Sequence, residues 1–537
     1  MIHQNKLSNK LLLPCCVFFL VFVVACNTAS QVISPANAVP TFDANLLGTV
    51  IVQTANAAST QIAARTTSTF TPTPTFINAP EILPIETLTP SSSGSFQPGD
   101  PTATPLGSDI TDTNFITGVE AHAAKDYAQT VALMSSAINT NPNLAPPYRY
   151  RGISYWYLGK CNEALADFDH ALSINPDYAA AWAGHALANN CLGNEEQQLL
   201  DYQKALSIDP SLAFVHANLG VYYYGQGNYE KSLEEYTMSV VIDPYRAGAW
   251  SGKAEALFKL GQYGECIVNA SKAIEINPEE WLAYSDRAFC EDFAGNNTAA
   301  IKDYQIYIAN ADANAVTWYN LGLAQRKAGD YEAAIASYTK ALELDPSYYP
   351  AYINRGHVYI LMEKYEKALV DYNKALELGD VPLAYSGRGD TYYGLEKYSK
   401  AIDDYKKAIE LNPYDAHSYC FLSLSYFEIQ KYQDSIDAAE MSREIDPNCG
   451  GQKLLETEAR SYYALGNYDQ GLVYINKALA TGDYALGHYY RGIIYQATGK
   501  NQEAIQDLGL FLSLIQSPES FQDEVKDAKA RLAKLKQ

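Results

Sequence analysis

A chain of 537 residues is longer than one hydrophobic core usually serves, so several domains or an array of repeats is expected. Acidic residues outnumber basic ones by 61 to 39, and the resulting formal charge of −22 argues against nucleic-acid binding and against electrostatic docking on an anionic membrane. The apolar content of 47% argues against a wholly disordered chain. The sequence contains no HExxH motif and no CxxC motif, so we expect no metal site and no cofactor.

The first 25 residues predict an export signal. Lys6 and Lys10 precede an apolar run over residues 11–25, which is shorter than the roughly 20 residues that span a membrane. The run ends in VVAC, and this ending resembles the lipobox of bacterial lipoproteins. The resemblance implies that Cys26 carries lipid and that the protein is a membrane-anchored, extracytoplasmic lipoprotein of the cell envelope, in contact with the membrane only through its anchor. An uncleaved anchor and an ordinary signal peptide are the alternatives.

Residues 26–110 predict a disordered tether. The stretch is rich in Thr, Ser and Ala and contains ten prolines, which block helix formation, and it offers no sustained apolar face. A loose chain of this length spans roughly 50 Å. We interpret the segment as a spacer that lets the folded part stand away from the lipid surface.

Residues 111–518 repeat with a period of 34 residues. Prolines at 142, 176, 210, 244 and 278 set the spacing. Twelve repeats begin at residues 111, 145, 179, 213, 247, 281, 315, 349, 382, 416, 452 and 485. Each repeat is predicted to form two helices joined by a turn rich in Gly and Asn, and in most repeats a proline ends the second helix, although repeat six ends in Asp312. Residues 519–537 predict an amphipathic helix that caps the array.

Two positions of the repeat indicate how the helices pack. The eighth residue is Gly, Ala or Ser in all twelve repeats, which predicts a close approach of two helix axes. The eleventh residue is Tyr in seven repeats, and we interpret most of these rings as core.

The pattern resembles the tetratricopeptide repeat family. The second repeat carries the clearest match, in Tyr148, Gly152, Tyr155, Ala164, Phe168, Ala171 and Pro176. The resemblance implies an all-α, right-handed α-solenoid of about twelve helix-turn-helix units, in which the first helices line a concave groove. It also implies a non-catalytic scaffold that binds a protein or peptide, and the sequence shows no GxSxG motif, phosphate loop or Ser/His/Asp grouping. A structural spacer, a surface that captures glycans or solutes, and an enzyme are the alternatives.

The family places groove contacts at repeat positions two, five, nine, twelve and thirteen. Here these positions give Arg149, Trp156, Tyr224, Phe258, Phe289, Tyr319, Arg326, Tyr393, Phe427, Tyr463 and Tyr489. The Lys-x-x-Gly-Asn motif with which some members hold a C-terminal carboxylate is absent. Aromatic groove residues in a protein of net negative charge predict a ligand that is an extended apolar or basic segment. The alternative is that these rings only help neighbouring repeats to pack.

A correlation between repeats predicts structural ion pairs. Five repeats have Arg at position seven, and the same five have Asp at position 23, which lies opposite in an antiparallel helix pair. The predicted pairs are Arg151–Asp167, Arg287–Asp303, Arg355–Asp371, Arg388–Asp404 and Arg491–Asp507.

Six cysteines follow the lipidation site and form three couples in adjacent repeats. The couples are Cys161 with Cys191, Cys266 with Cys290, and Cys420 with Cys449. Because an exported chain can form and keep disulfides, we expect the couples to be bonded. The alternative is that they are small core residues.

Overall fold

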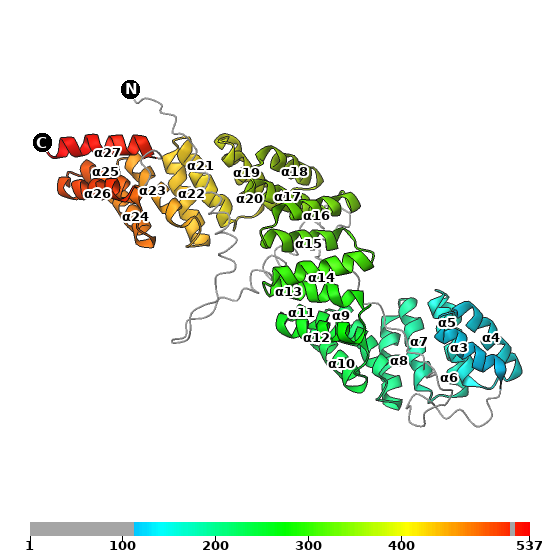
Figure 1. Ribbon diagram of the computed structural model, residues 1–537. Coiled ribbons are helices and arrows are strands. Elements are labelled where there is room, and N and C mark those ends of the chain that lie inside the picture. The colour runs from blue at the N-terminus through cyan, green and yellow to red at the C-terminus, as the bar shows by residue number, and fades with distance from the viewer. Residues whose placement is uncertain (1–111, 516–520) are drawn as a thin grey trace, which may run out of the picture. The chain divides into compact units, whose positions relative to one another are not determined.

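The computed structural model describes residues 112–515 and 521–537 (Figure 1). The predicted signal segment and tether, Cys26 included, lie outside these residues. The described residues form 25 α-helices and no strand, which confirms the prediction of an all-α solenoid of helix pairs. The helices divide into two compact units, an N-terminal unit that ends at Ala328 and a C-terminal unit that begins at Gly329.

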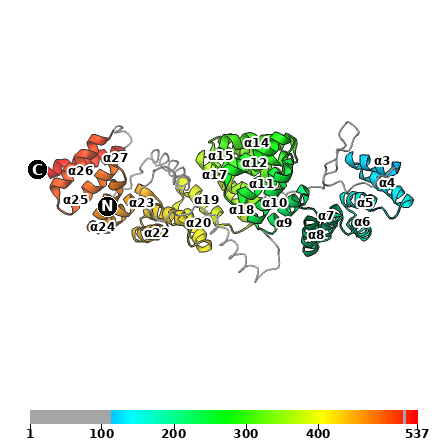
Figure 2. The ribbon, with the colours of Figure 1, turned by 90° about the horizontal axis from the view of Figure 1, so that it is seen from below.

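Each repeat supplies one pair of helices. The first helices are α3 (Thr113–Ala123), α5 (Ala145–Tyr157), α7 (Ala179–Cys191), α9 (Ala213–Gly225), α11 (Ala247–Lys259), α13 (Trp281–Phe293), α15 (Ala315–Lys327), α17 (Tyr349–Leu361), α19 (Pro382–Gly394), α21 (Ala416–Glu428), α23 (Gly451–Ala464) and α25 (Ala485–Ala497). The second helices are α4 (Tyr127–Thr140), α6 (Cys161–Ile174), α8 (Glu195–Ile208), α10 (Tyr229–Ile242), α12 (Tyr263–Ile276), α14 (Asn297–Asn310), α16 (Tyr331–Leu344), α18 (Tyr365–Leu378), α20 (Tyr398–Leu411), α22 (Tyr432–Ile445), α24 (Tyr468–Thr481) and α26 (Asn501–Leu514). Figure 2 shows two such pairs, α5–α6 and α7–α8, side by side.

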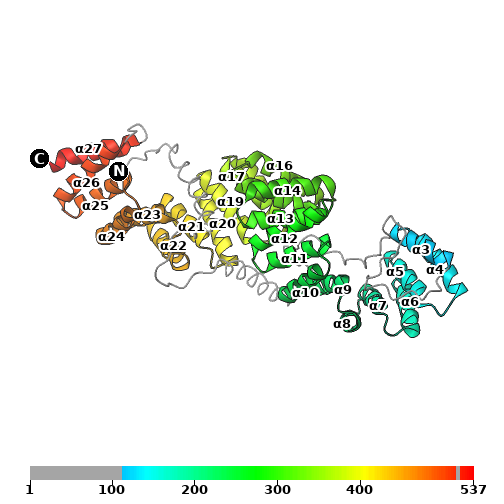
Figure 3. The same cartoon turned by 60° about the horizontal axis from the view of Figure 1, so that its bottom comes forward.

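The last helix, α27 (Gln522–Leu535), packs on α26 at the end of the array (Figure 3). Ala528 and Leu532 are buried, and Val525 and Leu535 pack partly buried against the same core cluster. The helix therefore covers the apolar face that the last repeat leaves open. Among the described helices, none combines the length and the apolar character needed to cross a membrane.

The turn between the two helices requires a left-handed backbone at position 15 of every repeat. Glycine takes this position in eight repeats, with φ between 71° and 86°. Lys125, Glu363, Glu396 and Gln430 take it in the other four, with φ between 56° and 63°. A side chain in this conformation costs about 1–2 kcal/mol, because its Cβ crowds the following carbonyl.

One ring in each of seven repeats fills the space between three helices. Position 24, in the second helix, carries Phe168, Tyr202, Tyr236, Tyr304, Tyr338, Tyr372 and Tyr405, and all of these side chains are almost completely buried. The ring of Tyr236 lies against Gly220 of its own repeat and Gly252 of the next, where an added Cβ would lie 2.9 and 2.3 Å from ring atoms. A small residue at position eight therefore makes room for the side chain at position 24. At Gly152 and Gly492 an added Cβ would also lie 3.3 Å from a backbone atom of the facing helix, which confirms the predicted close approach of the two helices there.

The tyrosines at position eleven lie at the edge of the core. Tyr426 is buried, and the other six are half-buried. Five of those six pack against core clusters, which confirms the assignment to the core in part: Tyr155, Tyr223, Tyr359, Tyr392 and Tyr495. Several lie beneath lysine side chains, for example Tyr223 beneath Lys231 at 5.1 Å and Tyr392 beneath Lys400 at 5.4 Å. Their rings are shielded by charged side chains at the surface, an arrangement that position in the repeat alone does not reveal.

The five predicted arginine–aspartate pairs have one common geometry. Each Arg donates from Nε and Nη2 to the two oxygens of its Asp, at distances from 2.6 to 2.9 Å. Each Nη1 also donates to position 25 of the preceding repeat, at Ser135, Ser271, Thr339, Asn373 or Asn476. The pairs therefore link neighbouring repeats as well as the two helices of one repeat.

The cysteine couples fall into two groups. Cys161 is bonded to Cys191 and Cys266 to Cys290, with Cα atoms 6.0 and 6.2 Å apart. Cys420 and Cys449 are free, so the structure does not contain the third predicted bond. The two thiols are nevertheless neighbours, because Cys449 packs against the core cluster that contains Cys420. Sequence spacing identified the contact between these residues but not whether their sulfurs are joined.

We predict that Glu396→Gly stabilises the C-terminal unit by roughly 0.5–1 kcal/mol, because glycine relieves the left-handed strain at an exposed position. Thermal unfolding followed by circular dichroism measures the change. Glu396→Ala keeps the Cβ atom and is the matched control. Equal melting temperatures for the two variants would contradict this account of the turn.

We predict that Asp371→Asn destabilises the C-terminal unit by about 3–5 kcal/mol, because the Asp371 side chain is 3% exposed and its loss leaves the largely buried guanidinium of Arg355 without a carboxylate. The double change Arg355→Met with Asp371→Leu should cost less than Asp371→Asn alone, since it removes both buried charges. Urea unfolding followed by circular dichroism measures both values. A double variant less stable than the single one would refute this interpretation.

Candidate binding surface on the first helices

The first helices of successive repeats contact one another within each unit. Such contacts join α3 to α5, α5 to α7, α9 to α11 and α11 to α13 in the N-terminal unit, and α17, α19, α21, α23 and α25 in sequence in the C-terminal unit. In the described part of the chain, no two second helices make comparable contact. The first helices are thus more closely spaced than the second helices, and they line the inner side of each unit.

A pair of aromatic rings recurs on this inner side. The ring at position twelve lies against the tyrosine that begins the second helix, at position 17. The pairs are Tyr224–Tyr229, Phe258–Tyr263, Tyr393–Tyr398, Phe427–Tyr432 and Tyr463–Tyr468, with ring centroids 5.4–5.8 Å apart. The five position-twelve rings are half-buried, so each is held by its own repeat and keeps part of its surface exposed.

In the N-terminal unit, Phe258 and Phe289 belong to one aromatic cluster. Phe258 lies 5.8 Å from Phe289 and 5.0 Å from Phe293, measured between ring centroids. Lys327 lies over the Phe293 ring and makes an ion pair of 2.8 Å with Asp292. Phe293 is more than half exposed, and the sequence analysis did not include it among the groove residues.

The other predicted groove residues of this unit are more dispersed. Trp156, Tyr319 and Arg326 are half-buried, and Trp156 lies against Tyr157 at 5.0 Å. Arg149 is a correction to the groove assignment, because it is only 7% exposed. Its guanidinium lies over the Tyr150 ring at 4.8 Å.

Two carboxyl groups of the same unit hold protons unusually tightly. Burial, above all, raises the pKa of Glu255 to about 7. Burial and the nearby Glu255 raise the pKa of Asp286 well above its usual range. Ser251 donates a hydrogen bond of 2.6 Å to Asp286, and Lys259 lies near Glu255. The inner side of this unit is therefore acidic and aromatic, but part of its formal charge is neutralised by protons.

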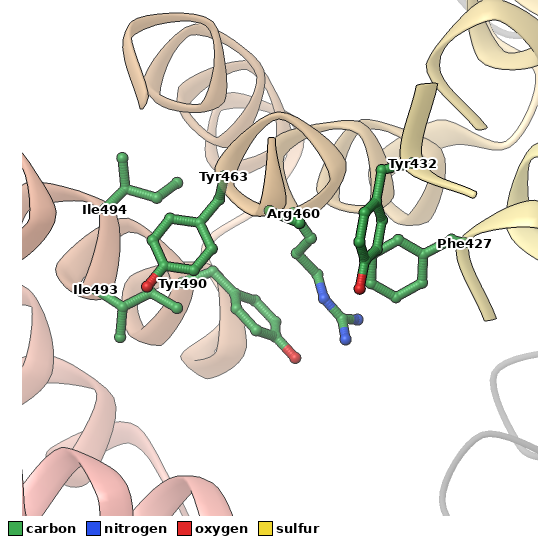
Figure 4. Close-up of a pocket in the computed structure, with 8 residues that line it drawn as sticks. Phe427, Tyr432, Arg460, Tyr463, Tyr490, Ile493 and Ile494 are labelled. Carbon is green, nitrogen blue, oxygen red and sulfur yellow. The ribbon is translucent and has the colours of Figure 1, made fainter. Parts of the chain in front are cut away.

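A pocket of about 250 Å³ opens on the inner side of the C-terminal unit. It is lined by Phe427, Tyr432, Arg460, Tyr463, Ala464, Tyr490, Ile493 and Ile494, from α21–α23 and α25 (Figure 4). Two predicted groove residues, Phe427 and Tyr463, lie in this wall. Arg460, Tyr490 and Ile493 were missed, although Arg460 and Ile493 occupy position nine of their repeats, which the family pattern marks.

Arg460 is held between two aromatic rings. Its guanidinium carbon lies 4.4 Å from the centroid of Phe427 and 4.5 Å from that of Tyr490. Figure 4 shows the guanidinium projecting between these rings into the open part of the pocket. Nη1 contacts Glu456 at 3.3 Å. Burial lowers the pKa of Arg460, but Tyr490, Glu456 and Glu428 together raise it above its usual value, so the group stays charged.

Tyr489 is a second correction to the groove assignment. It is 9% exposed, and its hydroxyl donates to Asp527 of α27 at 2.9 Å. The cap helix packs over this part of the last repeat and brings Tyr489 into the core. Within residues 112–515 and 521–537, no three His, Cys, Asp or Glu side chains form a group that could hold a metal ion.

These features define a class of protein: an all-α repeat protein with partly exposed aromatic rings along its first helices. Tetratricopeptide repeat models match residues 151–213, 247–280, 315–348, 349–379, 382–415 and 457–510. The matched repeats are tetratricopeptide repeats, and their presence supports a protein-interaction scaffold. A comparison with curated proteins finds no match.

Several solved structures are similar to this chain. The Cut9–Hcn1 hetero-tetramer of the APC/C is 14% identical over 77% of this chain and 95% of its own, with a TM-score of 0.41. Pseudomonas aeruginosa pilF is 19% identical over 38% of this chain and 92% of its own, with a TM-score of 0.36. YrrB, described as a TPR protein with an unusual peptide-binding site, is 19% identical over 35% of this chain and 96% of its own, with a TM-score of 0.31.

We predict that the stability of the N-terminal unit falls as the pH rises from about 4.5 toward 7. Glu255 has a higher pKa in the folded than in the unfolded chain, so folding retains a proton that is lost as the pH passes through the folded pKa of about 7. All five tryptophans lie in this unit, so urea unfolding followed by tryptophan fluorescence measures it selectively. Glu255→Gln should reduce the decline and leave the part that is due to Asp286, whereas Glu265→Gln, at an exposed position of the same repeat, should not change it. A decline of the parental size in Glu255→Gln would contradict the assignment.

Proposed function

We propose that this chain is a non-catalytic scaffold that binds a protein or peptide along its first helices and is displayed from a membrane of the cell envelope. The half-buried aromatic rings of the inner side carry the proposal. Each ring is held by a tyrosine of its own repeat, so it presents apolar surface without the entropy cost of ordering a free side chain when a ligand binds. Exposed aromatic surface held in place is a common source of binding energy in protein interfaces.

The display at a membrane rests on the N-terminal sequence. A lipidated Cys26 would supply the membrane contact, and residues 26–110 would supply the reach. The two disulfides support this part of the proposal, because bonded cysteines persist in an oxidising compartment outside the cytosol. Formation of bonds across adjacent repeats also suits a scaffold that must keep its shape without cytosolic chaperones.

The anchor is tested by metabolic labelling with a palmitate analogue in the native cell. The parent should incorporate label and partition with membranes, and Cys26→Ala should lose both properties. Incorporation at an unchanged level in Cys26→Ala would contradict lipidation at this residue. This experiment is independent of what the repeats bind.

We predict that Phe427→Ala with Tyr463→Ala abolishes most capture of the partner while leaving helicity intact, because both rings are half-buried and braced at the inner side. Crosslinking in the native cell followed by mass spectrometry identifies the partner, and capture by each variant is then compared. Tyr414→Ala is the control, because Tyr414 is a highly exposed aromatic residue in a loop between repeats. Equal capture by the double variant and the control would refute the inner-side assignment, and the absence of any crosslinked partner would favour a structural spacer.

A further inference from the structure

The pocket around Arg460 holds a guanidinium between two aromatic rings, those of Phe427 and Tyr490. The Arg460 side chain is 28% exposed, whereas its partner Glu456 is 5% exposed and is also paired with Lys453 at 3.5 Å. Glu456 is thus shared by two cations. Glu428 and Glu524 also act on the groups of this pocket, so the guanidinium itself, and not the net charge of its surroundings, is what could bind a carboxylate.

The five arginine–aspartate pairs of the same chain show which edge of a guanidinium holds a carboxylate here. In each pair, Nε and Nη2 hold the two carboxylate oxygens, and Nη1 makes a separate contact with a neighbouring repeat. Arg460 uses Nη1 for Glu456. Within the residues that the structure describes, its Nε and Nη2 donate no hydrogen bond, so the edge that binds Asp in the five pairs is open in the pocket.

The apolar walls beside this edge limit what the ligand can be. Tyr463, Ile493 and Ile494 form the wall next to Tyr490 (Figure 4). The pocket volume of about 250 Å³ equals the space of roughly eight water molecules. This is enough for one apolar side chain and one carboxylate group. The charges of Glu428 and Glu524 act on the Tyr490 hydroxyl and therefore repel any carboxylate in the pocket, so the hydrogen bonds from Arg460 must outweigh this repulsion.

The pocket continues into the row of paired rings on one side. Tyr393 on α19 lies 5.6 Å from Phe421 on α21, and the next position-twelve ring along this row is Phe427, in the pocket wall. We take the ligand to be a segment that passes along the first helices and carries the carboxylate on a side chain; a carboxylate at a chain end is the other arrangement, and the peptide probes described below distinguish the two.

We propose that the Arg460 pocket binds an acidic side chain, Asp or Glu, that lies next to an aromatic or branched aliphatic residue in an extended segment of the partner. The carboxylate accepts two hydrogen bonds from Nε and Nη2 of Arg460, and the apolar neighbour packs on Tyr463, Ile493 and Ile494. This inference rests on the proposed scaffold function and narrows it to one kind of ligand. It differs from the sequence analysis, which expects an apolar or basic ligand from the acidic composition of the whole chain.

Fluorescence anisotropy with the full-length chain and labelled pentapeptides tests the inference. The probes are Leu-Phe-Glu-Phe-Leu blocked at both ends, the same peptide with Gln in place of Glu, and the Gln peptide with a free C-terminal carboxylate. A bidentate, charge-assisted pair predicts that the blocked Glu peptide binds about tenfold or more tightly than the blocked Gln peptide. Higher salt should narrow this ratio, since the contact is partly exposed.

Three variants locate the effect. Arg460→Met keeps the apolar stem and should bring the Glu peptide to the affinity of the Gln peptide, while circular dichroism shows an intact fold. Arg460→Lys keeps the charge but loses the planar edge, and it should lose most of the preference. Lys477→Met is the control, because Lys477 also lies over an aromatic ring, Tyr474, but is exposed on the second helix α24.

Each other outcome overturns the proposal. Equal binding of the Glu and Gln peptides, or a preference that survives Arg460→Met, shows that Arg460 does not bind a carboxylate. Preferential binding of the peptide with a free C-terminus shows that the pocket takes a chain end. No binding of any probe also refutes the inference, but the scaffold function is then still measured separately, by the crosslinking experiment and the Phe427/Tyr463 double variant.

Discussion

The packing of one buried ring per repeat is the constraint on which most of the array depends. The ring at position 24 occupies the space between the first helix of its own repeat and the first helix of the next. For Tyr372 the neighbours are Gly356 and Gly387, where an added Cβ would lie 3.1 and 2.4 Å from ring atoms. Because one side chain touches both helices, it fixes the spacing within a repeat and between repeats at once. A close-packed interior tolerates little change at such a contact.

Polar contacts reinforce this packing at the same interfaces. The arginine of each Arg–Asp pair lies on the first helix and contacts the second helix of its own repeat and the second helix of the preceding repeat, so it joins neighbouring repeats as the buried ring does. His185 has the same role in the third repeat, where it contacts Asp201 at 2.6 Å and Asp169 at 3.3 Å. The buried charges contribute less to stability than to the choice of one geometry, because their desolvation offsets much of their attraction.

The inner side combines packing with partly exposed aromatic surface. The position-twelve rings pack on tyrosines of their own repeats. Phe258 and Tyr393 also contact rings of the next repeat, so these side chains help to join neighbouring repeats. The two units differ on this side, with protonated carboxyls around Glu255 and Asp286 in one and an arginine between two rings in the other.

The sequence by itself determined the all-α repeat fold, because a 34-residue period with recurrent Gly and Pro admits one local structure. It also determined the five ion pairs, since position seven and position 23 vary together from repeat to repeat. Only the tertiary structure decided which side chains are buried and which are accessible. Tyr489 lies in the core because α27 covers it, and Arg460 is accessible because Phe427 and Tyr490, from two other repeats, hold its guanidinium at the mouth of a pocket. Such environments are built from several repeats at once, and a pattern within one repeat contains no information about them.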